Sequence, residues 1–422
     1  MKKRQILTVL TLFLMLVGAT FGQGNKAALI DDFVNRMAKD NQFAGVVLAA
    51  ENGNIIYEKA FGLANADYKI PNQLNTRIGI ASITKLMTVV ILNRLIEQGK
   101  IANADKLSKF IPDFPDGDKI TIEMLARHRS GIQHRVMPPE AESLSYTSAE
   151  FVEKVKAAKL AFEPGAQRLY SSGGYAVLAR CLEIASGKSY AELLHKFVFA
   201  PAQMTDSVDF NGEMIMERRA QDYYLSPNGL VNVPLKDYSF LVGAGSVYST
   251  ARDVFRFGNA VLDGTYGEAS KNTLVGQTVL SGSGSTNGHR SYLEIEKNKK
   301  YAFVVLANLG GVFDLVSQGV KEILEGKEVS VKTVSIPKII PNPNKDLSEF
   351  LGRYKRSDGS ETTILLRNGS LWSADIKLYP IRPDCFFEYR FFGEACFNRD
   401  PTGKITEIRW KGVNFDLLWA RQ

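Results

Sequence analysis

The spacing of apolar residues predicts many helices lying between two pairs of strands. Apolar residues recur at helical spacing in residues 26–39, 82–98, 121–127, 148–158, 173–186, 189–198, 251–262 and 313–324. Two pairs of β-rich segments flank most of these helices, namely 46–50 with 55–61 and 288–296 with 301–308. Asn52-Gly53 joins the first pair, which is a strong hairpin signal. Strands from both ends of this stretch can meet in one mostly antiparallel sheet, which predicts an α+β fold with helices packed on the sheet.

The pattern changes after residue 325. Residues 326–346 hold prolines and lysines without a helical period, which predicts an extended linker. Residues 347–422 alternate apolar and polar positions over short runs, and turn signals such as Asn368-Gly369 separate these runs. We therefore expect a large domain over residues 23–325 and a small all-β meander or barrel over residues 347–422.

The first residues have the order of a secretory signal peptide. Three cations at residues 2–4 precede an unbroken run of apolar or hydroxyl residues at 6–17, and small residues follow. The run is too short to span a bilayer comfortably, and no later stretch is long and apolar enough to do so. We expect a signal peptide over residues 1–22, a periplasmic or secreted protein, and no membrane span in the mature chain.

The charge balance limits the classes of partner. The formal net charge is +7, and removal of the three signal cations leaves 7 − 3 = +4. No basic cluster with interleaved aromatic residues accompanies this mild excess, so nucleic acid is not an expected partner. A small-molecule or peptide substrate fits the charge, and so does association with the cell wall.

Cysteine and histidine usage predicts neither a disulfide scaffold nor a metal site. The chain has three cysteines, a low and odd number for an exported protein. Cys181 lies in an apolar helical stretch and is expected to be buried. Cys385 and Cys396 could pair, but a hairpin turn near Gly393 would not place them opposite each other, so we expect no bond. The histidines are scattered and no metal-ligand spacing occurs, so neither a metal nor a cofactor is predicted.

The segment Ser82-Ile-Thr-Lys85 holds two residues that could form a nucleophile and its base. A helix that begins at Ser82 places Lys85 on the same face, within reach of the hydroxyl. Ser82 would lie at the positive end of that helix, where backbone amides can stabilise an oxyanion. Apolar neighbours would bury Lys85 and favour its neutral amine, which can act as a base. The motif alone is weak, because a second copy lies in the linker at 335–338 and a helix cap beside a solvated lysine would look the same.

Four segments in a fixed order make the signal more specific. They are IASITKLMTVVILNRLIEQGKI, TIEMLARHRSGI, FEPGAQRLYSSGGYAVLARCLEIASGKSY and GAGSVYSTARDVFRF. Over about residues 26–325 the chain resembles the serine β-lactamase, D,D-peptidase and family VIII esterase group, especially its class C-like branch. The resemblance implies a five-stranded sheet with a helical insertion. The C-terminal segment is similar to small β domains appended to such proteins.

The resemblance also implies roles for individual residues. Ser82 matches the acylated nucleophile, Lys85 its basic partner, and Tyr170 the tyrosine of the Y-x-N motif. A phenol held between two cations would lose its proton more easily than usual, and Tyr170 could then shuttle a proton to the leaving group. The resemblance also implies a substrate-binding set, made up of Ser172, Ser283, Gly284 and Ser285. The backbone N–H of Ser285 would be the second oxyanion donor beside that of Ser82.

Three departures from the family pattern bear on activity. Ser172 stands where the family has asparagine, and a hydroxyl cannot offer the separate donor and acceptor of an amide. Gly282-Ser-Gly284 stands where the family has K-T-G or H-x-G, so the basic residue is missing. Our hypothesis is that His289 or Arg290 replaces it from a shifted register. The segment 264–281 is short enough for one strand to be lost. The glycine-rich run 282–288 could instead be a flexible loop, whereas its spacing does not fit a nucleotide-binding loop.

Three functions remain open from the sequence. The first is a serine hydrolase that forms an acyl-enzyme on Ser82 with an ester, a D-amino-acid peptide or a β-lactam. The second is a degenerate relative that binds a wall peptide or partner without turnover, which Ser172 and Gly282 favour. The third is an unrelated exported binding protein. His128 lies in a stretch that matches a structural part of the family, so we interpret it as structural, and His134 and His195 receive no role.

Overall fold

The computed structural model describes residues 25–39, 42–298, 300–330, 336–344, 346–374, 376–412 and 415–422. The predicted signal peptide, residues 1–22, lies outside the described residues, as do residues 331–335 and 345 of the predicted linker. No helix among the described residues is long and apolar enough to cross a bilayer.

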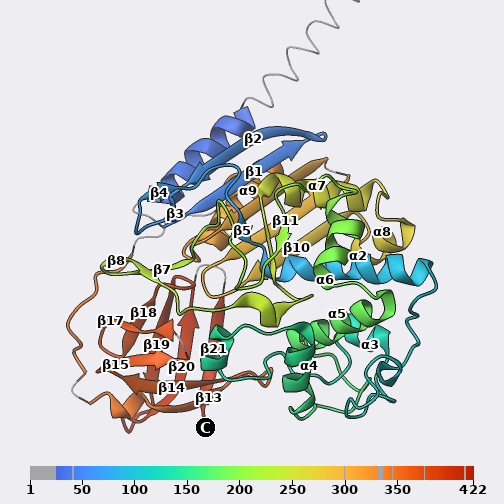
Figure 1. Ribbon diagram of the computed structural model, residues 1–422. Coiled ribbons are helices and arrows are strands. Elements are labelled where there is room, and N and C mark those ends of the chain that lie inside the picture. Colours follow the sequence, from blue (N-terminus) through green and yellow to red (C-terminus); the bar gives the residue numbers. More distant parts are fainter. Residues whose placement is uncertain are drawn as a thin grey trace, which may run out of the picture.

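A five-stranded antiparallel sheet forms the centre of the larger part of the molecule (Figure 1). Its strand order is β10 (Val279–Ser285), β11 (Arg290–Glu296), β12 (Tyr301–Ala307), β1 (Gly45–Glu51) and β2 (Asn54–Phe61). The predicted turn joins β1 to β2, and both of its residues, Asn52 and Gly53, have the positive φ angles that a tight hairpin needs. The predicted sheet, assembled from strands at both ends of the stretch, is therefore confirmed.

Both faces of this sheet are covered, so its central strands are apolar on both sides. Val46 and Leu48 of β1 pack into one cluster with α7 (Ala251–Leu262) and α2 (Thr84–Glu97). Val47 and Ala49 point the other way, into a cluster with the helix at residues 25–38 and with α9 (Phe313–Leu324). The period-two alternation along β1 divides the core into two layers.

The helical insertion lies between β2 and β10 along the chain. Its helices are η2 (Ala81–Ile83), α2, η3 (Leu107–Lys109), α3 (Ile122–Ala126), η4 (Pro139–Ser143), α4 (Ser148–Lys156), α5 (Ser172–Ser186), α6 (Tyr190–Leu194), η5 (His195–Phe199), η6 (Tyr238–Leu241), α7 and α8 (Glu268–Leu274). Its short strands are β3 (Leu63–Asn65), β4 (Ile70–Pro71), β5 (Ile78–Gly79), β6 (Val208–Asp209), β7 (Tyr223–Ser226), β8 (Gly229–Asn232) and β9 (Val247–Ser249). The helix predicted at 251–262 is confirmed, and Thr250 caps it as expected by accepting from the N–H of Asp253.

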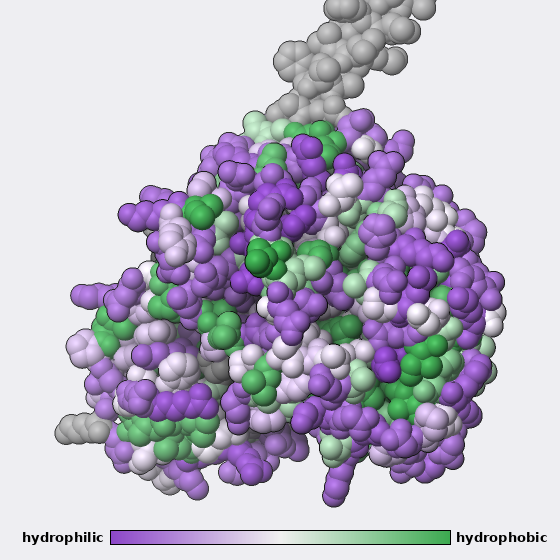
Figure 2. All heavy atoms as spheres, in the orientation of Figure 1, coloured by the Kyte–Doolittle hydropathy of each residue, from purple (hydrophilic) through white to green (hydrophobic). Residues whose placement is uncertain are grey.

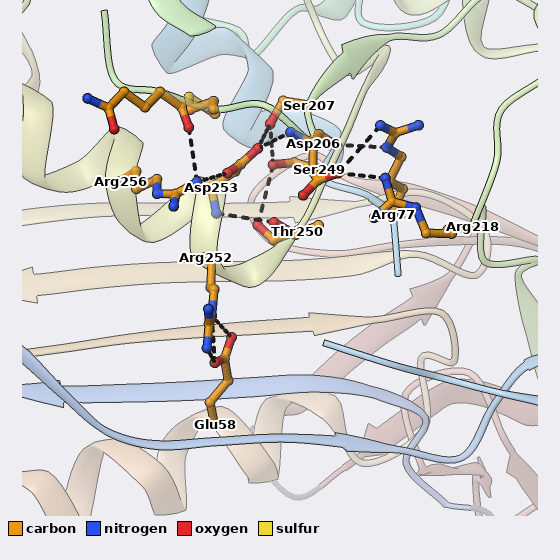
Figure 3. Close-up of polar contacts among 12 residues, drawn as sticks. Glu58, Arg77, Asp206, Ser207, Arg218, Ser249, Thr250, Arg252, Asp253 and Arg256 are labelled. Carbon is orange, nitrogen blue, oxygen red and sulfur yellow. Dashed lines mark hydrogen bonds and ion pairs between the residues drawn. The ribbon is translucent and has the colours of Figure 1, made fainter. Parts of the chain in front are cut away.

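Polar contacts at the start of α7 connect this helix to the short sheet that precedes Ser82 (Figure 3). Asp253 accepts from the N–H of Asp206 at 2.8 Å and from the hydroxyl of Ser207 at 3.0 Å. Arg77, directly before β5, donates to the carbonyl of Asp206 at 3.0 Å. Because β5 is followed within three residues by Ser82, this network fixes the approach of the chain to Ser82.

The C-terminal part is a nine-stranded antiparallel sheet that curls around its own core. In sheet order its strands are β16 (Ile376–Lys377), β15 (Ser370–Ser373), β14 (Glu361–Arg367), β13 (Gly352–Lys355), β21 (Asp416–Arg421), β20 (Ile405–Lys411), β19 (Gly393–Arg399), β18 (Cys385–Glu388) and β17 (Tyr379–Arg382), and η7 (Ser348–Phe350) precedes them. The first and last strands of the sheet are consecutive in sequence, so the sheet is nearly closed. The predicted β meander or barrel is confirmed.

A disulfide joins the two cysteines that we expected to remain apart. The β18–β19 hairpin pairs Glu388 with Gly393, and this register places Cys385 opposite Cys396, where they form a disulfide. Our expectation was wrong because we placed the turn near Gly393. The turn occupies residues 389–392, so its centre lies midway between Cys385 and Cys396. Cys181 is buried and free, as predicted.

The two sheets meet through an apolar contact. Phe387, Tyr389 and Phe392 of the C-terminal sheet belong to the same buried cluster as Leu309 and Phe313. In Figure 1, β17 and β18 lie on the side of the C-terminal sheet that faces β7 and β8. Figure 2 shows a mainly hydrophilic face, with apolar residues in separate small groups over the C-terminal sheet and over the helical region.

Candidate active site

Ser82 lies in the turn between β5 and α2. The turn is η2, and the residue before Ser82, Ala81, has a φ angle of 46°, which is unusual for a residue with a side chain. Such a conformation costs on the order of 1–3 kcal/mol and persists only where the surroundings enforce it. Here Ala81 is buried, and Ile80 on its other side donates its N–H to the carbonyl of Val247. The helix predicted to begin at Ser82 therefore begins with a strained 3₁₀ turn.

Lys85 is the central group of the cluster. Its Nζ lies 3.2 Å from Ser82 Oγ, 3.2 Å from Ser172 Oγ and 2.8 Å from the carbonyl oxygen of Ala244. The residue is only 5% exposed, and burial lowers the pKa of its amine from the ordinary 10.5 to about 7. Both protonation states of Lys85 are therefore populated near neutral pH.

Tyr170 completes the surroundings of Ser82. Its hydroxyl donates to Ser82 Oγ at 2.8 Å, and the Lys85 Nζ lies 4.8 Å from the centre of its ring. Burial raises the pKa of Tyr170, and the hydrogen bond to Ser82 offsets this only in part. This direction is opposite to our expectation of an easily lost phenol proton, because partial burial of the ring favours its neutral form. Tyr170 is a neutral donor here.

Two histidines support the loop-to-helix junction that carries Tyr170 and Ser172. His128 Nδ1 accepts from the N–H of Ser171 at 3.1 Å, and His134 Nδ1 accepts from the N–H of Ser172 at 3.2 Å. Their rings lie 4.5 and 5.4 Å from that of Tyr170. Partial burial and the charge of Lys85 lower the pKa of His128 to about 4, so its ring is neutral. The contacts of His128 agree with a structural role. The role of His134 was missed, because it depends on a loop folding back to a residue 38 positions later.

Strand β10 brings the glycine-rich segment to Ser82. A Cβ at Gly284 would lie 2.3 Å from the carbonyl oxygen of Ile80 and 2.8 Å from the nitrogen of Ser82, distances that no side chain can occupy. A Cβ at Gly282 would lie 2.7 Å from a methyl group of Leu86. The two glycines thus permit a close approach of strand and helix. Residues 282–285 of the glycine-rich run belong to β10, so the flexible-loop interpretation is wrong for them. The sheet also keeps five strands, although the short segment 264–281 left room for one to be lost.

The two candidates for the missing basic residue are placed differently. His289 is 1% exposed, burial lowers its pKa, and its ring lies 5.2 Å from that of Tyr248. Arg290 lines a cavity that also reaches Ser82, but its Nη2 donates to both carboxylate oxygens of Asp314 at 2.7 and 2.8 Å. The hypothesis that His289 supplies the charge is therefore wrong, and the charge of Arg290 is already paired.

Two hollows meet at Ser82. The larger has a volume of about 670 Å³ and is lined by Lys85, Tyr170 and the segment 282–285. The smaller has a volume of about 90 Å³ and contains Ser172, Asn287 and the buried ion pair of Lys236 with Glu142. Ser82, His134 and Ser285 line both. The structure thus brings Ser82, Lys85, Tyr170, Ser172, Ser283, Gly284 and Ser285 to one place. Among the described residues no group of three or more His, Cys, Asp or Glu side chains could hold a metal ion.

Comparison with known proteins gives a family for the arrangement. The sequence model of the family described as Beta-lactamase matches residues 30–317. The chain is 28% identical over 261 residues to the "Putative penicillin-binding protein PbpX" of Bacillus subtilis, covering 62% of this chain and 64% of that protein. It is 31% identical over 267 residues to "Penicillin-binding protein 4*" of the same organism, covering 58% of each. The match to the "Teichoic acid D-alanine hydrolase" of Staphylococcus aureus is 27% over 221 residues, covering 52% of this chain and 55% of that protein. The chain therefore spans less than two thirds of the length of these relatives.

Solved structures have the same fold. FmtA from Staphylococcus aureus superimposes with a TM-score of 0.64 at 22% identity, covering 74% of this chain and 93% of that one. The octameric penicillin-binding protein homologue from Pyrococcus abyssi gives a TM-score of 0.61 at 21% identity and covers 93% of this chain and 99% of that one. The second likeness extends over most of the chain, so it includes much of the C-terminal sheet.

Proposed function

Because the chain belongs to the Beta-lactamase family, we propose that it is an exported serine hydrolase that works through an acyl-enzyme on Ser82. The observation that carries the proposal is that the amine of Lys85 and the phenol of Tyr170 both contact Ser82 Oγ, which faces a cavity large enough for a substrate. A serine needs a group that takes its proton, and a buried amine with a pKa of about 7 is suited to that task near neutral pH.

The contacts of Lys85 support the role of base. A neutral amine has two N–H groups and one lone pair. The carbonyl of Ala244 and the hydroxyl of Ser172 are placed to accept the two N–H groups, which leaves the lone pair for the proton of Ser82. Ser172 can make this contact although it replaces an asparagine of the family pattern. On attack, the proton of Ser82 passes to Lys85, and Ser82 Oγ bonds to the substrate carbonyl carbon.

Tyr170 is the candidate acid for the leaving group. Its hydroxyl already points at Ser82 Oγ, and in the acylation step it would give its proton to the departing oxygen or nitrogen. The Lys85 ammonium, close to the ring, would stabilise the phenolate. In the second step the phenolate would take a proton from the attacking water, and Lys85 would return its proton to Ser82. The backbone N–H groups of Ser82 and Ser285 are the candidate oxyanion donors, and the close approach at Gly284 supports this pairing.

The candidate substrates are an ester, a D-amino-acid peptide or a β-lactam. Gly282 offers no cation, and Arg290 is paired with Asp314. We therefore favour an ester or amide without a free carboxylate beside the scissile bond. The name of one relative, a teichoic acid D-alanine hydrolase, supports D-alanine esters or amides and a cell-wall association as candidates.

Export rests on residues 1–22 and gains support from the disulfide between Cys385 and Cys396. Disulfides persist in oxidising compartments. A periplasmic or secreted location is consistent with both features.

The test is intact mass after incubation with a fluorophosphonate probe and, separately, with a penicillin. We expect a covalent adduct on the wild-type protein and none on Ser82→Ala, because only an activated serine reacts. Ser143→Ala, which removes an exposed hydroxyl outside the cluster, serves as the matched control and should label like the wild type. An adduct that persists in Ser82→Ala contradicts the assignment. A folded wild-type protein that reacts with neither reagent supports the alternative of a family member that binds without turnover, which Gly282 favours.

A further inference from the structure

The hairpin loop at residues 388–393 brings the C-terminal sheet to the active-site region. Tyr389 and Phe392 of the loop, with Phe387 just before it, belong to the buried cluster that also contains Leu309 and Phe313. A Cβ at Gly311 would lie 3.6 Å from the ring of Phe392, and one at Gly310 would lie 3.1 Å from the carbonyl oxygen of Arg390. The loop therefore packs directly on the segment that leads into α9.

A single carboxylate holds the loop in shape. Glu388 is 0% exposed, and its oxygens accept from the N–H groups of Arg390 at 2.8 Å, Phe391 at 3.0 Å and Gly393 at 2.9 Å. These bonds satisfy three backbone donors of the loop internally, and the side chains of Arg390 and Phe391 remain for contacts outside it. The loop is a preformed element with a fixed shape.

Both of these side chains contact the turn that follows Ser285. The guanidinium of Arg390 makes a long hydrogen bond of 3.5 Å to the side-chain oxygen of Asn287, which is 5% exposed and lines the smaller hollow. The ring of Phe391 lies 5.7 Å from the guanidinium carbon of Arg290, which lines the larger hollow. The ring of Phe313 lies 5.2 Å from the same carbon. Arg290 is thus held by aromatic rings from both parts of the molecule.

The turn between these contacts carries the candidate oxyanion donor. Ser285 pairs with Arg290 across the β10–β11 hairpin, and the N–H of Thr286 donates to the carbonyl of His289 to close the turn. On the other side, a Cβ at Gly288 would lie 2.4 Å from Asp222, so the insertion supports the turn there. At Asn287 and Arg290 the turn meets the C-terminal loop.

We propose that the loop at residues 388–393 is a clamp that holds the turn at residues 285–290. Arg390 and Phe391 are its positioning residues, and they keep the backbone N–H of Ser285 in place beside Ser82. The C-terminal sheet then contributes to the rate of acylation without touching the substrate. The catalytic consequence rests on the proposed function, whereas the clamp itself does not.

The test compares full-length wild type, Arg390→Ala, Arg390→Lys and Phe391→Leu by hydrogen–deuterium exchange and by the rate of Ser82 labelling with the fluorophosphonate. In Arg390→Ala we expect faster exchange in peptides covering 285–290, unchanged exchange in those covering 79–87, and labelling about tenfold slower, since a displaced oxyanion donor weakens transition-state stabilisation. Arg390→Lys should recover part of both effects. Phe391→Leu, which keeps the loop apolar, should give a smaller change of the same kind.

Arg409→Ala is the matched control, because Arg409 forms an exposed ion pair on β20 in the same sheet. It should leave both measurements unchanged. Unchanged exchange at 285–290 in Arg390→Ala overturns the clamp. Faster exchange with unchanged labelling overturns its catalytic consequence. A wild type that does not label overturns the proposed function, and the exchange result then still decides the clamp.

Discussion

Lys85 on α2 and Glu388 at the end of β18 are both almost fully buried, with 5% and 0% of their surface exposed. Burial moves the pKa of each to about 7, downward for the amine and upward for the carboxyl. Their neighbours differ. Glu388 turns both oxygens onto backbone N–H groups of its own loop, whereas Lys85 faces a serine hydroxyl and a cavity. A perturbed pKa therefore does not by itself distinguish a reactive group from a structural one, and the partners of the group do.

The largest expected effect is on the rate of covalent labelling at Ser82, which should depend on Lys85 and not on Glu388. Lys85→Met should slow Ser82 labelling by roughly 10²–10⁴-fold, the usual contribution of a general base. Its stability should not fall, because methionine fills a similar volume without a buried charge. The measurements are the labelling rate and urea unfolding. Glu388→Gln is the control and should label within about tenfold of wild type. Labelling of Lys85→Met at the wild-type rate would show that another group activates Ser82.

The second effect distinguishes Glu388 from Lys85 by how the free energy of unfolding depends on pH. The folded-state pKa of Glu388 lies above its ordinary 4.5, so between about 4.5 and 7 the folded state binds more protons, and stability falls as pH rises. The folded-state pKa of Lys85 lies below its ordinary 10.5, so between about 7 and 10.5 the unfolded state binds more protons, and stability rises with pH. Each pKa unit corresponds to about 1.4 kcal/mol.

Urea unfolding from pH 4.5 to 10.5 checks this prediction. Glu388→Gln should flatten the fall below pH 7 and leave the rise above it, and Lys85→Met should do the opposite. Parallel curves for a variant and the wild type would mean that the burial of that group does not perturb its titration as inferred.

The smallest expected effect concerns charge selectivity at Arg290. Because Asp314 pairs with its guanidinium, Arg290→Ala should change the ratio of KM values for an anionic and a neutral ester by less than about threefold. The ratio isolates charge recognition from any change in the shape of the turn. A KM for the anionic ester that rises alone, by tenfold or more, would revive Arg290 as the missing cation of the family motif.

Local signals predicted much of the fold. Asn52-Gly53 gave the first hairpin, and the apolar spacing at 251–262 and 313–324 gave α7 and α9 with their observed bounds. These features depend on residues close together in the chain. The β18–β19 register was missed, because a turn of residues 389–392 fixed by the buried Glu388 has no glycine or proline signal in its centre.

The site was predictable in part. Ser82 and Lys85 are one helical turn apart, so their contact follows from local geometry. Tyr170 and Ser285 came from the family resemblance, because nothing local connects them to Ser82. The contributions of Ala244, His134 and Arg390 depend on segments that meet only in the folded chain. The pKa direction of Tyr170 was missed because burial of its ring is a property of the assembled cluster.

The way in which the nine-stranded sheet ends has a consequence for self-association. Unpaired strand edges are templates onto which another chain can add, and long flat edges promote aggregation. The outermost strands here, β16 with two residues and β17 with four, are short, and they follow each other in the chain. The sheet thus offers a second molecule little free backbone. We expect the C-terminal part to be a poor nucleus for amyloid-like growth.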